Sequence, residues 1–119
     1  LCDLCISRDI GVVTYYSLAS GFLTGKYRQQ SDLAQSQRGG GIGKYLNPRG
    51  LRIVDTLVEV AEQSGAKPAE VALAWLMSRD GVTAPIASAT SLAQVESFAR
   101  AAALSLSADQ LARLDSASA

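Results

Sequence analysis

A chain of 119 residues fits one small domain and is long enough to bury a hydrophobic core. Its 48% hydrophobic and 18% charged residues are typical of a soluble globular protein. Eleven basic and eleven acidic residues cancel, which argues against binding to nucleic acid or to an anionic membrane surface. No apolar run approaches the roughly 18 residues that a membrane-spanning helix needs. Charged residues also interrupt the N-terminal segment, so we expect a cytoplasmic protein without a signal peptide.

The first eleven residues, LCDLCISRDIG, read like the last turns of a helix that runs into a strand. They hold both cysteines, Cys2 and Cys5. A CxxC pair can be a redox dithiol or half of a zinc site. With no histidine and no third cysteine, the chain cannot complete a zinc site of four nitrogen and sulfur ligands by itself. We therefore interpret the pair as neighbours on one helical face.

Val12 to Tyr16 is a short β-branched and aromatic run, which predicts a buried strand. A long polar loop is expected from Ser17 to Gly50, with a short helical turn around Phe22 to Tyr27. Within it, the glycine cluster at Arg38 to Gly41 matches neither P-loop nor GxGxxG spacing. We interpret this cluster as a loop whose Arg38 can move onto an anion.

Two helical patterns follow the loop. The SGA sequence at 64–66 is expected to end the first helix. This helix is predicted by apolar residues at helical spacing, Leu51, Val54, Leu57, Val58 and Ala61. Pro68 suits the first turn of the second helix, which Gly81 is expected to end. Its apolar side carries Val71, Ala74, Trp75 and Leu76.

A second short strand is predicted at Thr83 to Ala87. Ser91 and Gln94 have the spacing of a capping box that opens a third helix. The inner stripe of this helix is expected to comprise Leu92, Val95, Phe98 and Ala102. Ser107 and Gln110 repeat the box before a last helix that carries Leu111 and Leu114. The order of strand, helices, strand and helices predicts the consecutive βα units of a parallel α/β protein.

Two strands make an incomplete sheet, because a parallel sheet needs both faces and both edges covered. We expect the remaining strands to come from a longer parent chain, a partner or another copy. Exposed strand edges would favour a homo-oligomer.

Ligands of α/β folds bind at the carboxyl ends of the strands. There, Tyr15 or Tyr16 can present a ring face to a planar ligand, and the small residues from Ser17 to Gly21 let backbone amides approach it. The second strand leads into the capped helix through 88–94, whose amides and dipole favour a phosphate. Hydroxyl donors lie close by at Ser88, Thr90 and Ser91. Together these features suit an extended nucleotide cofactor, although any βα unit has a small-residue turn at this place.

A catalytic acid–base set is harder to find in the sequence. Without histidine, neither a Ser-His-Asp triad nor a histidine proton relay is available within these residues. Lys26, Tyr27 and Tyr45 can act as acids in principle, but no pattern places them around a reaction centre.

Two ordered motifs resemble the aldo-keto reductase family. GVVTYYSLASGFLTGKYR, at 11–28, is similar to the segment around the seventh strand of the family, and KPAEVALAWLMSRDGVTAPIASATSLAQVESF, at 67–98, to its last helix, eighth strand and cofactor-binding helix. The similarity extends from about Gly11 to Leu114. It implies that residues 1–119 are the cofactor-binding, C-terminal third of a (β/α)8 TIM barrel. It also implies an NADPH-dependent oxidoreductase that reduces a small-molecule carbonyl substrate, an aldehyde or a ketone, to an alcohol.

The resemblance assigns roles to residues that match the motifs. Tyr15 falls on the tyrosine that stacks against the nicotinamide ring. The backbone that follows the cofactor matches Tyr16, Ser17, Leu18, Ala19, Ser20 and Gly21. Lys26 and Arg38 match basic loop positions that approach the cofactor phosphates. The seat of the adenosine 2′-phosphate, which favours NADPH over NADH, matches Ser88, Thr90 and Gln94.

The sequence departs from the family pattern at Tyr16 and Ser17, where the commoner pattern has Ser and Pro, and in two further ways. Ser97 and Phe98 stand where many members carry the Glu and Asn that hold the adenine. The catalytic Asp, Tyr, Lys and His of the family lie on early strands, upstream of the matched segment. We therefore expect no catalytic residue within this chain and no activity from the chain alone. The alternative is a non-catalytic binding or self-association module derived from the same fold.

Overall fold

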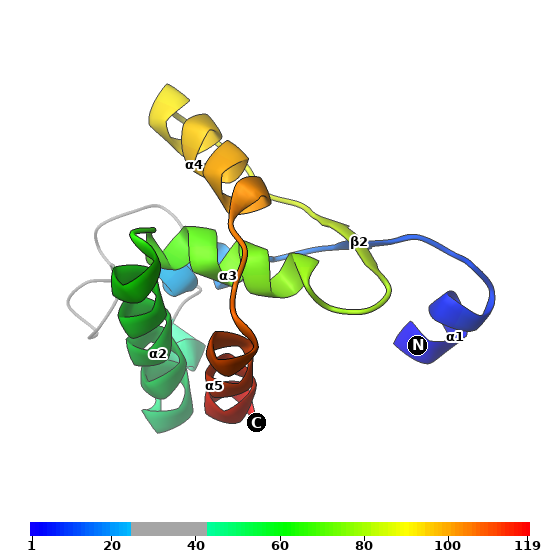
Figure 1. The fold of residues 1–119 in the computed structure, drawn as a ribbon, viewed down its shortest axis with the longest axis horizontal. Helices are drawn as coiled ribbons and strands as arrows, with labels where there is room; N and C mark the ends of the chain where they lie inside the picture. The colour runs from blue at the N-terminus through cyan, green and yellow to red at the C-terminus, as the bar shows by residue number, and fades with distance from the viewer. Residues whose placement is uncertain (25–42) are drawn as a thin grey trace.

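The computed structural model describes residues 1–24 and 43–119, with the backbone alone for Ser20 (Figure 1). Its elements in chain order are α1 (Cys2–Ser7), β1 (Val12–Thr14), the 3-10 helices η1 (Ala19–Thr24) and η4 (Gly43–Tyr45), α2 (Pro48–Ser64), α3 (Pro68–Met77), β2 (Val82–Pro85), α4 (Leu92–Ala103) and α5 (Ala108–Ser118).

β1 and β2 form a parallel two-stranded sheet, which confirms the predicted α/β class. Val12 pairs with Val82 and Thr14 with Pro85, with an irregularity between Val12 and Val13. Beyond the ladder, the Ile86 amide donates to the Thr14 carbonyl at 2.9 Å. The two strands therefore end side by side, and the segments that follow them leave the sheet at the same end.

The sheet is exposed, so the prediction of a buried first strand is wrong. Val13 is 56% exposed, and Ile86 at the end of β2 is 48% exposed. The helix α3 packs against β2. Within the described residues, neither edge of the sheet pairs with a further strand. A β-branched sequence therefore forms a strand here without acquiring the cover that normally buries one.

Helix α2 begins earlier than its apolar pattern predicts, because Asn47 caps it. The Asn47 Oδ1 accepts from the Gly50 amide at 2.8 Å, and Pro48 occupies the first helical position. Residues 48–50 thus belong to the helix and not to the preceding loop. At the other end, Gly65 adopts the left-handed φ of 64° that closes many helices, as the SGA sequence predicts.

The hydrophobic core lies among α2, α3 and α5, away from the sheet. It comprises Leu57, Val60, Ala61, Val71, Ala72 and Leu114. A neighbouring cluster contains Phe22 and Val54, and the Phe22 ring stacks on that of Tyr45 with centroids 5.5 Å apart. Five consecutive residues of α3, 70–74, are buried, because α2, α4 and β2 all pack around that helix. Figure 1 shows α3 crossing the middle of the molecule between α4 and the pair formed by α2 and α5.

Two further helix predictions need correction. Helix α3 ends at Met77, and Gly81, with a φ of 84°, forms the turn into β2 instead. The expected inner stripe of α4 is also wrong: Leu92 and Val95 are 73% and 51% exposed. The buried residues of α4 are Ser97 and Ala101, which lie on the face that packs against α3. In α5, by contrast, the box of Ser107 and Gln110 forms as predicted.

The N-terminal cysteines behave as two helical neighbours. Both lie in α1, both are free thiols, and the Cys2 Sγ lies 3.6 Å from the Asp80 carbonyl oxygen. Within residues 1–24 and 43–119, no group of three or more His, Cys, Asp or Glu side chains is placed to hold a metal ion. None of the described helices is long and apolar enough to cross a membrane.

Candidate functional site

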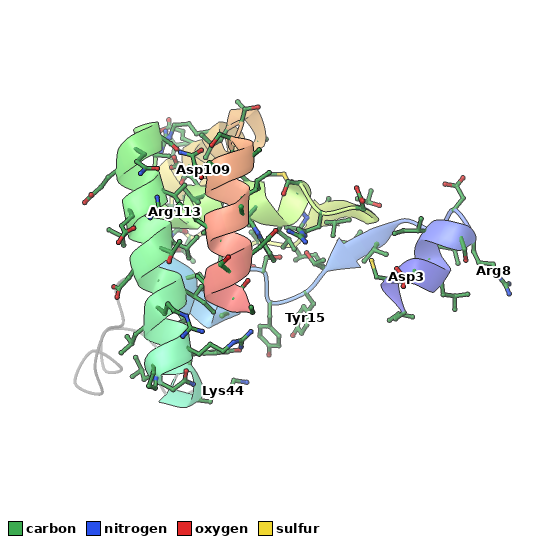
Figure 2. All side chains as sticks on the ribbon, turned by 60° about the horizontal axis from the view of Figure 1, so that its bottom comes forward. Asp3, Arg8, Tyr15, Lys44, Asp109 and Arg113 are labelled. Carbon is green, nitrogen blue, oxygen red and sulfur yellow. The ribbon has the colours of Figure 1, made fainter. Side chains whose placement is uncertain are left out.

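A pair of tyrosines stands at the carboxyl end of β1. The ring centroids of Tyr15 and Tyr16 lie 4.1 Å apart, with the planes tilted by 47°. The residues are 72% and 62% exposed, and Figure 2 shows the Tyr15 ring projecting away from the ribbon. Tyr16 has a φ of 54°, a left-handed conformation that costs a non-glycine residue about 1–3 kcal/mol. The chain therefore holds two aromatic rings at the surface in a turn that its backbone does not favour.

The residues after the tyrosines fold back on the strand end. The Ser17 hydroxyl donates to the Thr14 carbonyl at 3.2 Å. The Ala19 and Gly21 amides donate to the carbonyls of Tyr16 and Leu18, each at 2.9 Å. Ala19 and Gly21 both have positive φ, at 49° and 101°. Two of the amides expected to follow a cofactor are thus used inside this turn.

The first turn of α4 forms the second predicted site. The Ser91 hydroxyl accepts from the Gln94 amide at 3.3 Å, which confirms Ser91 as the cap. The reciprocal half of the box differs, because the Gln94 Oε1 accepts from the amide of Thr90, at 2.6 Å, and from its hydroxyl, at 3.2 Å. Gln94 thus binds both donors of Thr90. Ser88 and Thr90 are exposed.

The turn from Tyr15 to Gly21 and the residues after β2 lie at one end of the sheet, where the Ile86 amide donates to the Thr14 carbonyl. Figure 1 shows the first turn of α4 at the outer end of that helix, away from α3. Lys26, Tyr27 and Arg38 lie outside the described residues. Tyr45 is half-buried and stacked on Phe22, with the Lys44 ammonium 5.1 Å from its ring centroid, which indicates a structural role.

Glu70 is a buried carboxylate that the sequence patterns did not single out. It is 3% exposed, and its Oε2 accepts from the Ser97 hydroxyl at 2.6 Å and from the Arg100 Nε at 3.4 Å. The Oε1 accepts from the Lys67 amide at 3.4 Å. Burial raises the pKa of Glu70, but the bonds from Ser97 and Lys67 and the charge of Arg100 outweigh it, so the pKa lies below its ordinary value.

A glutamate at the third position of a helix normally caps the helix at the surface. The sequence context of Glu70 therefore did not predict that it is buried. The small residues Ser97 and Ala101, four apart on α4, were the available signal, because they let that helix approach closely. The Ser97 hydroxyl is committed to Glu70. Its one hydroxyl proton is therefore used within the protein.

An apolar cavity of about 280 Å³ lies among η1, α2, α3 and α5. Its wall includes Ser17, Phe22, Leu57, Trp75 and Leu114. Nearby, the Trp75 Nε1 and the Arg79 guanidinium both donate to the Asp115 Oδ1, at 2.8 and 2.6 Å. The Trp75 bond ties α3 to α5, and the half-buried Trp75 packs against the core cluster.

Known proteins of one family are similar in sequence to this chain. The family model described as the aldo/keto reductase family matches residues 1–119. An uncharacterized oxidoreductase of Mycobacterium tuberculosis is 42% identical over 105 residues, which cover 82% of this chain and 30% of that protein. L-glyceraldehyde 3-phosphate reductase of Escherichia coli is 31% identical over 122 residues, covering 97% of this chain and 35% of the enzyme.

A third relative is an aldo-keto reductase of Schizosaccharomyces pombe whose name specifies NADP(+). It is 27% identical over 85 residues, which cover 69% of this chain and 25% of that protein. The chain thus spans about a third of the length of the curated relatives it matches. With the family model matched from end to end, this chain belongs to the aldo/keto reductase family.

Proposed function

We propose that this chain is the cofactor-binding part of an NADPH-dependent oxidoreductase that reduces aldehydes or ketones to alcohols. Residues 1–119 would form strands seven and eight of a (β/α)8 barrel with their helices. The observation that carries the proposal is the exposed pair of Tyr15 and Tyr16 at the carboxyl end of a parallel strand, beside the segment that leads into the capped helix α4. Membership of the family supports it.

The described residues fit the nicotinamide end of such a cofactor. The Tyr15 ring is broad, apolar and 72% exposed, and Tyr16 supports it from one side at 4.1 Å. Stacking of a planar ring on Tyr15 would bury apolar surface on both partners. When bound, NADPH supplies the hydride that reduces the carbonyl carbon. The contribution of Tyr15 is to orient the ring and to exclude water from one of its faces.

The first turn of α4 fits a phosphate. A helix N-terminus carries partial positive charge and directs its unpaired amides outward, so it favours an anion. Ser88 and Thr90 add hydroxyl groups at the surface. A 2′-phosphate at this turn would compete with Gln94 for the two donors of Thr90. Gln94 would therefore either reorient its amide towards the phosphate or leave the turn.

The remaining assigned residues complete the proposed clamp. Ser17, Leu18, Ala19, Ser20 and Gly21 would line the path of the pyrophosphate, and Lys26 and Arg38 would neutralise its charge. The chemistry of proton transfer would belong to residues of the parent enzyme that precede this segment. A small-molecule carbonyl compound would be the substrate.

Titration of the chain with NADPH, with NADH as control, tests this proposal. Cofactor fluorescence should rise saturably, with tighter binding of NADPH. Tyr15→Ala should weaken binding about 5- to 10-fold, the loss expected for about 1 kcal/mol of ring stacking. Val13→Ala is the matched control, because Val13 is also an exposed residue of this sheet region and lies outside the proposed site.

Equal affinity for NADPH and NADH would contradict the proposed 2′-phosphate seat. Unchanged affinity of Tyr15→Ala would contradict the stacking role. If the folded chain binds neither nucleotide, it does not form a cofactor site by itself.

A second candidate function is self-association without catalysis. Exposed apolar side chains on the sheet and on α4 favour it, among them Val13, Ile86, Leu92 and Val95. The two strands also offer unpaired edges within the described residues. Light scattering across a concentration series would separate the two candidates. A concentration-dependent dimer that binds no nucleotide supports self-association.

A further inference from the structure

We propose that Glu70 is a positioning residue for the turn from Ser88 to Gln94, and that it thereby sets the preference for NADPH over NADH. It would act by anchoring α4 on α3, so that the first turn of α4 stands in the orientation that a 2′-phosphate requires. The effect on cofactor preference rests on the proposed function. The effect on the turn can be measured without any nucleotide.

The geometry of the Glu70 carboxylate makes it an anchor. Ser97 and Arg100 lie one turn apart on α4, and both donate to the same Oε2, at 2.6 and 3.4 Å. The Oε1 is held by the Lys67 amide at the start of α3. A shift of α4 would separate a buried charge from two of its three partners. Leaving a buried carboxylate without partners is costly, so the arrangement resists such a shift.

Among the described elements, helix α4 packs mainly against α3. It packs against α3 through the face of Ser97 and Ala101, the latter 1% exposed. The side of Leu92 and Val95 is open to solvent. Among the described side chains of α3, Glu70 is the one that forms hydrogen bonds or an ion pair to α4. The tilt and register of α4 therefore depend strongly on this carboxylate.

The proposed phosphate seat belongs to the same helix. Ser91 caps α4 six residues before Ser97, and Gln94 holds Thr90 from the first turn. An α-helix of 12 residues transmits a tilt from one end to the other because its backbone bonds are continuous. The net lowering of the Glu70 pKa means that the carboxylate is ionised at neutral pH, which is the form that accepts all three bonds.

Amide hydrogen exchange of the whole chain provides the first test. In Glu70→Gln, the amides of Thr90, Gln94 and Val95 should exchange at least about 10-fold faster, while those of 57–61 in α2 change less than about 2-fold. Ser97→Ala removes one of the three bonds and should produce a smaller change of the same pattern. Asp115→Asn is the control, since Asp115 ties α3 to α5 instead of α4. An unchanged rate at 90–95, or an equal increase everywhere, would overturn the inference.

Cofactor preference provides the second test, from the ratio of the NADH and NADPH dissociation constants. Glu70→Gln and Ser97→Ala should reduce this ratio, with a fall of about 10-fold for Glu70→Gln, because only NADPH carries the 2′-phosphate. Equal weakening of both nucleotides would indicate a purely structural residue and would overturn the specificity role. If the wild-type chain binds neither nucleotide, the proposed function fails for this chain, whereas hydrogen exchange still decides whether Glu70 positions the turn.

Discussion

The helical body formed by α2, α3 and α5 and the outer part formed by the sheet and α4 are built from similar residues but buried to different extents. Leu57, Val60 and Val71 in the body are at most 3% exposed. Val13, Leu92 and Val95 in the outer part are more than half exposed. The body buries its apolar stripes between three helices, whereas among the described elements the sheet and α4 pack mainly against α3. A hydrophobic pattern thus reports a tendency to be buried, and the presence of neighbours decides whether burial occurs.

The comparison also separates stability from proposed function. Tyr15 and the first turn of α4, two of the proposed cofactor contacts, lie in the outer part, while the core lies in the body. Substitutions in the body should therefore change the free energy of unfolding, and those in the outer part should mainly change binding. Glu70 is the exception, because it belongs to α3 and bonds to α4.

The largest expected effect is in the core. Leu57→Ala should lower the free energy of unfolding by about 2–5 kcal/mol, since it leaves a cavity between α2, α3 and α5. Val13→Ala should change it by less than about 0.5 kcal/mol, because that side chain is 56% exposed. Urea denaturation followed by circular dichroism at 222 nm measures both. A similar loss of unfolding free energy in Leu57→Ala and Val13→Ala would show that the sheet is as well packed as the body.

An intermediate effect is expected from Glu70, and it depends on pH. The folded state lowers the pKa of this carboxylate below its ordinary value of 4.5. The contribution of the ionised Glu70 to the free energy of unfolding is therefore present above pH 4.5 and is lost as the pH falls through the pKa of the folded state. Glu70→Gln should cost about 1–3 kcal/mol at pH 7 and should weaken the acid dependence of stability.

Denaturation curves at pH 7, 5 and 3 measure this dependence, with Asp115→Asn as the control. The groups that face the carboxylate are Ser97, the Lys67 amide and Arg100. If the free energies of unfolding of the wild-type chain and of Glu70→Gln fall in parallel as the pH is lowered, the pH dependence does not come from Glu70.

The smallest effects are expected at the helix caps, where the two parts can be compared directly. Asn47→Ala removes the acceptor for the Gly50 amide and should lower the free energy of unfolding by about 1 kcal/mol, because α2 belongs to the cooperative body. Ser91→Ala removes the equivalent bond to the Gln94 amide in α4. For this variant we expect a smaller loss of unfolding free energy, together with faster hydrogen exchange of the amides at 90–95. If Asn47→Ala and Ser91→Ala lose the same free energy of unfolding, α4 unfolds together with the body.

Local signals in the sequence were enough to locate most helix ends. Ser107 with Gln110, Pro68 and Gly65 act within one turn of the backbone, so no distant residue can easily override them. The parallel order of the strands also followed from the chain order of the elements. The tyrosine pair could be recognised as a candidate site because it ends a strand, where ligands of α/β folds bind.

Tertiary structure alone decided which faces are covered. Whether α4 turns Leu92 and Val95 or Ser97 and Ala101 towards α3 depends on the partner surface, and the buried Glu70 selects the latter. The exposure of Val13 likewise depends on what lies beside the sheet. Sequence period sets which residues share a helical face or strand side, because that is backbone geometry. Burial and the pairing of a charge depend on residues far away in the chain, and these are known only once the helices are packed.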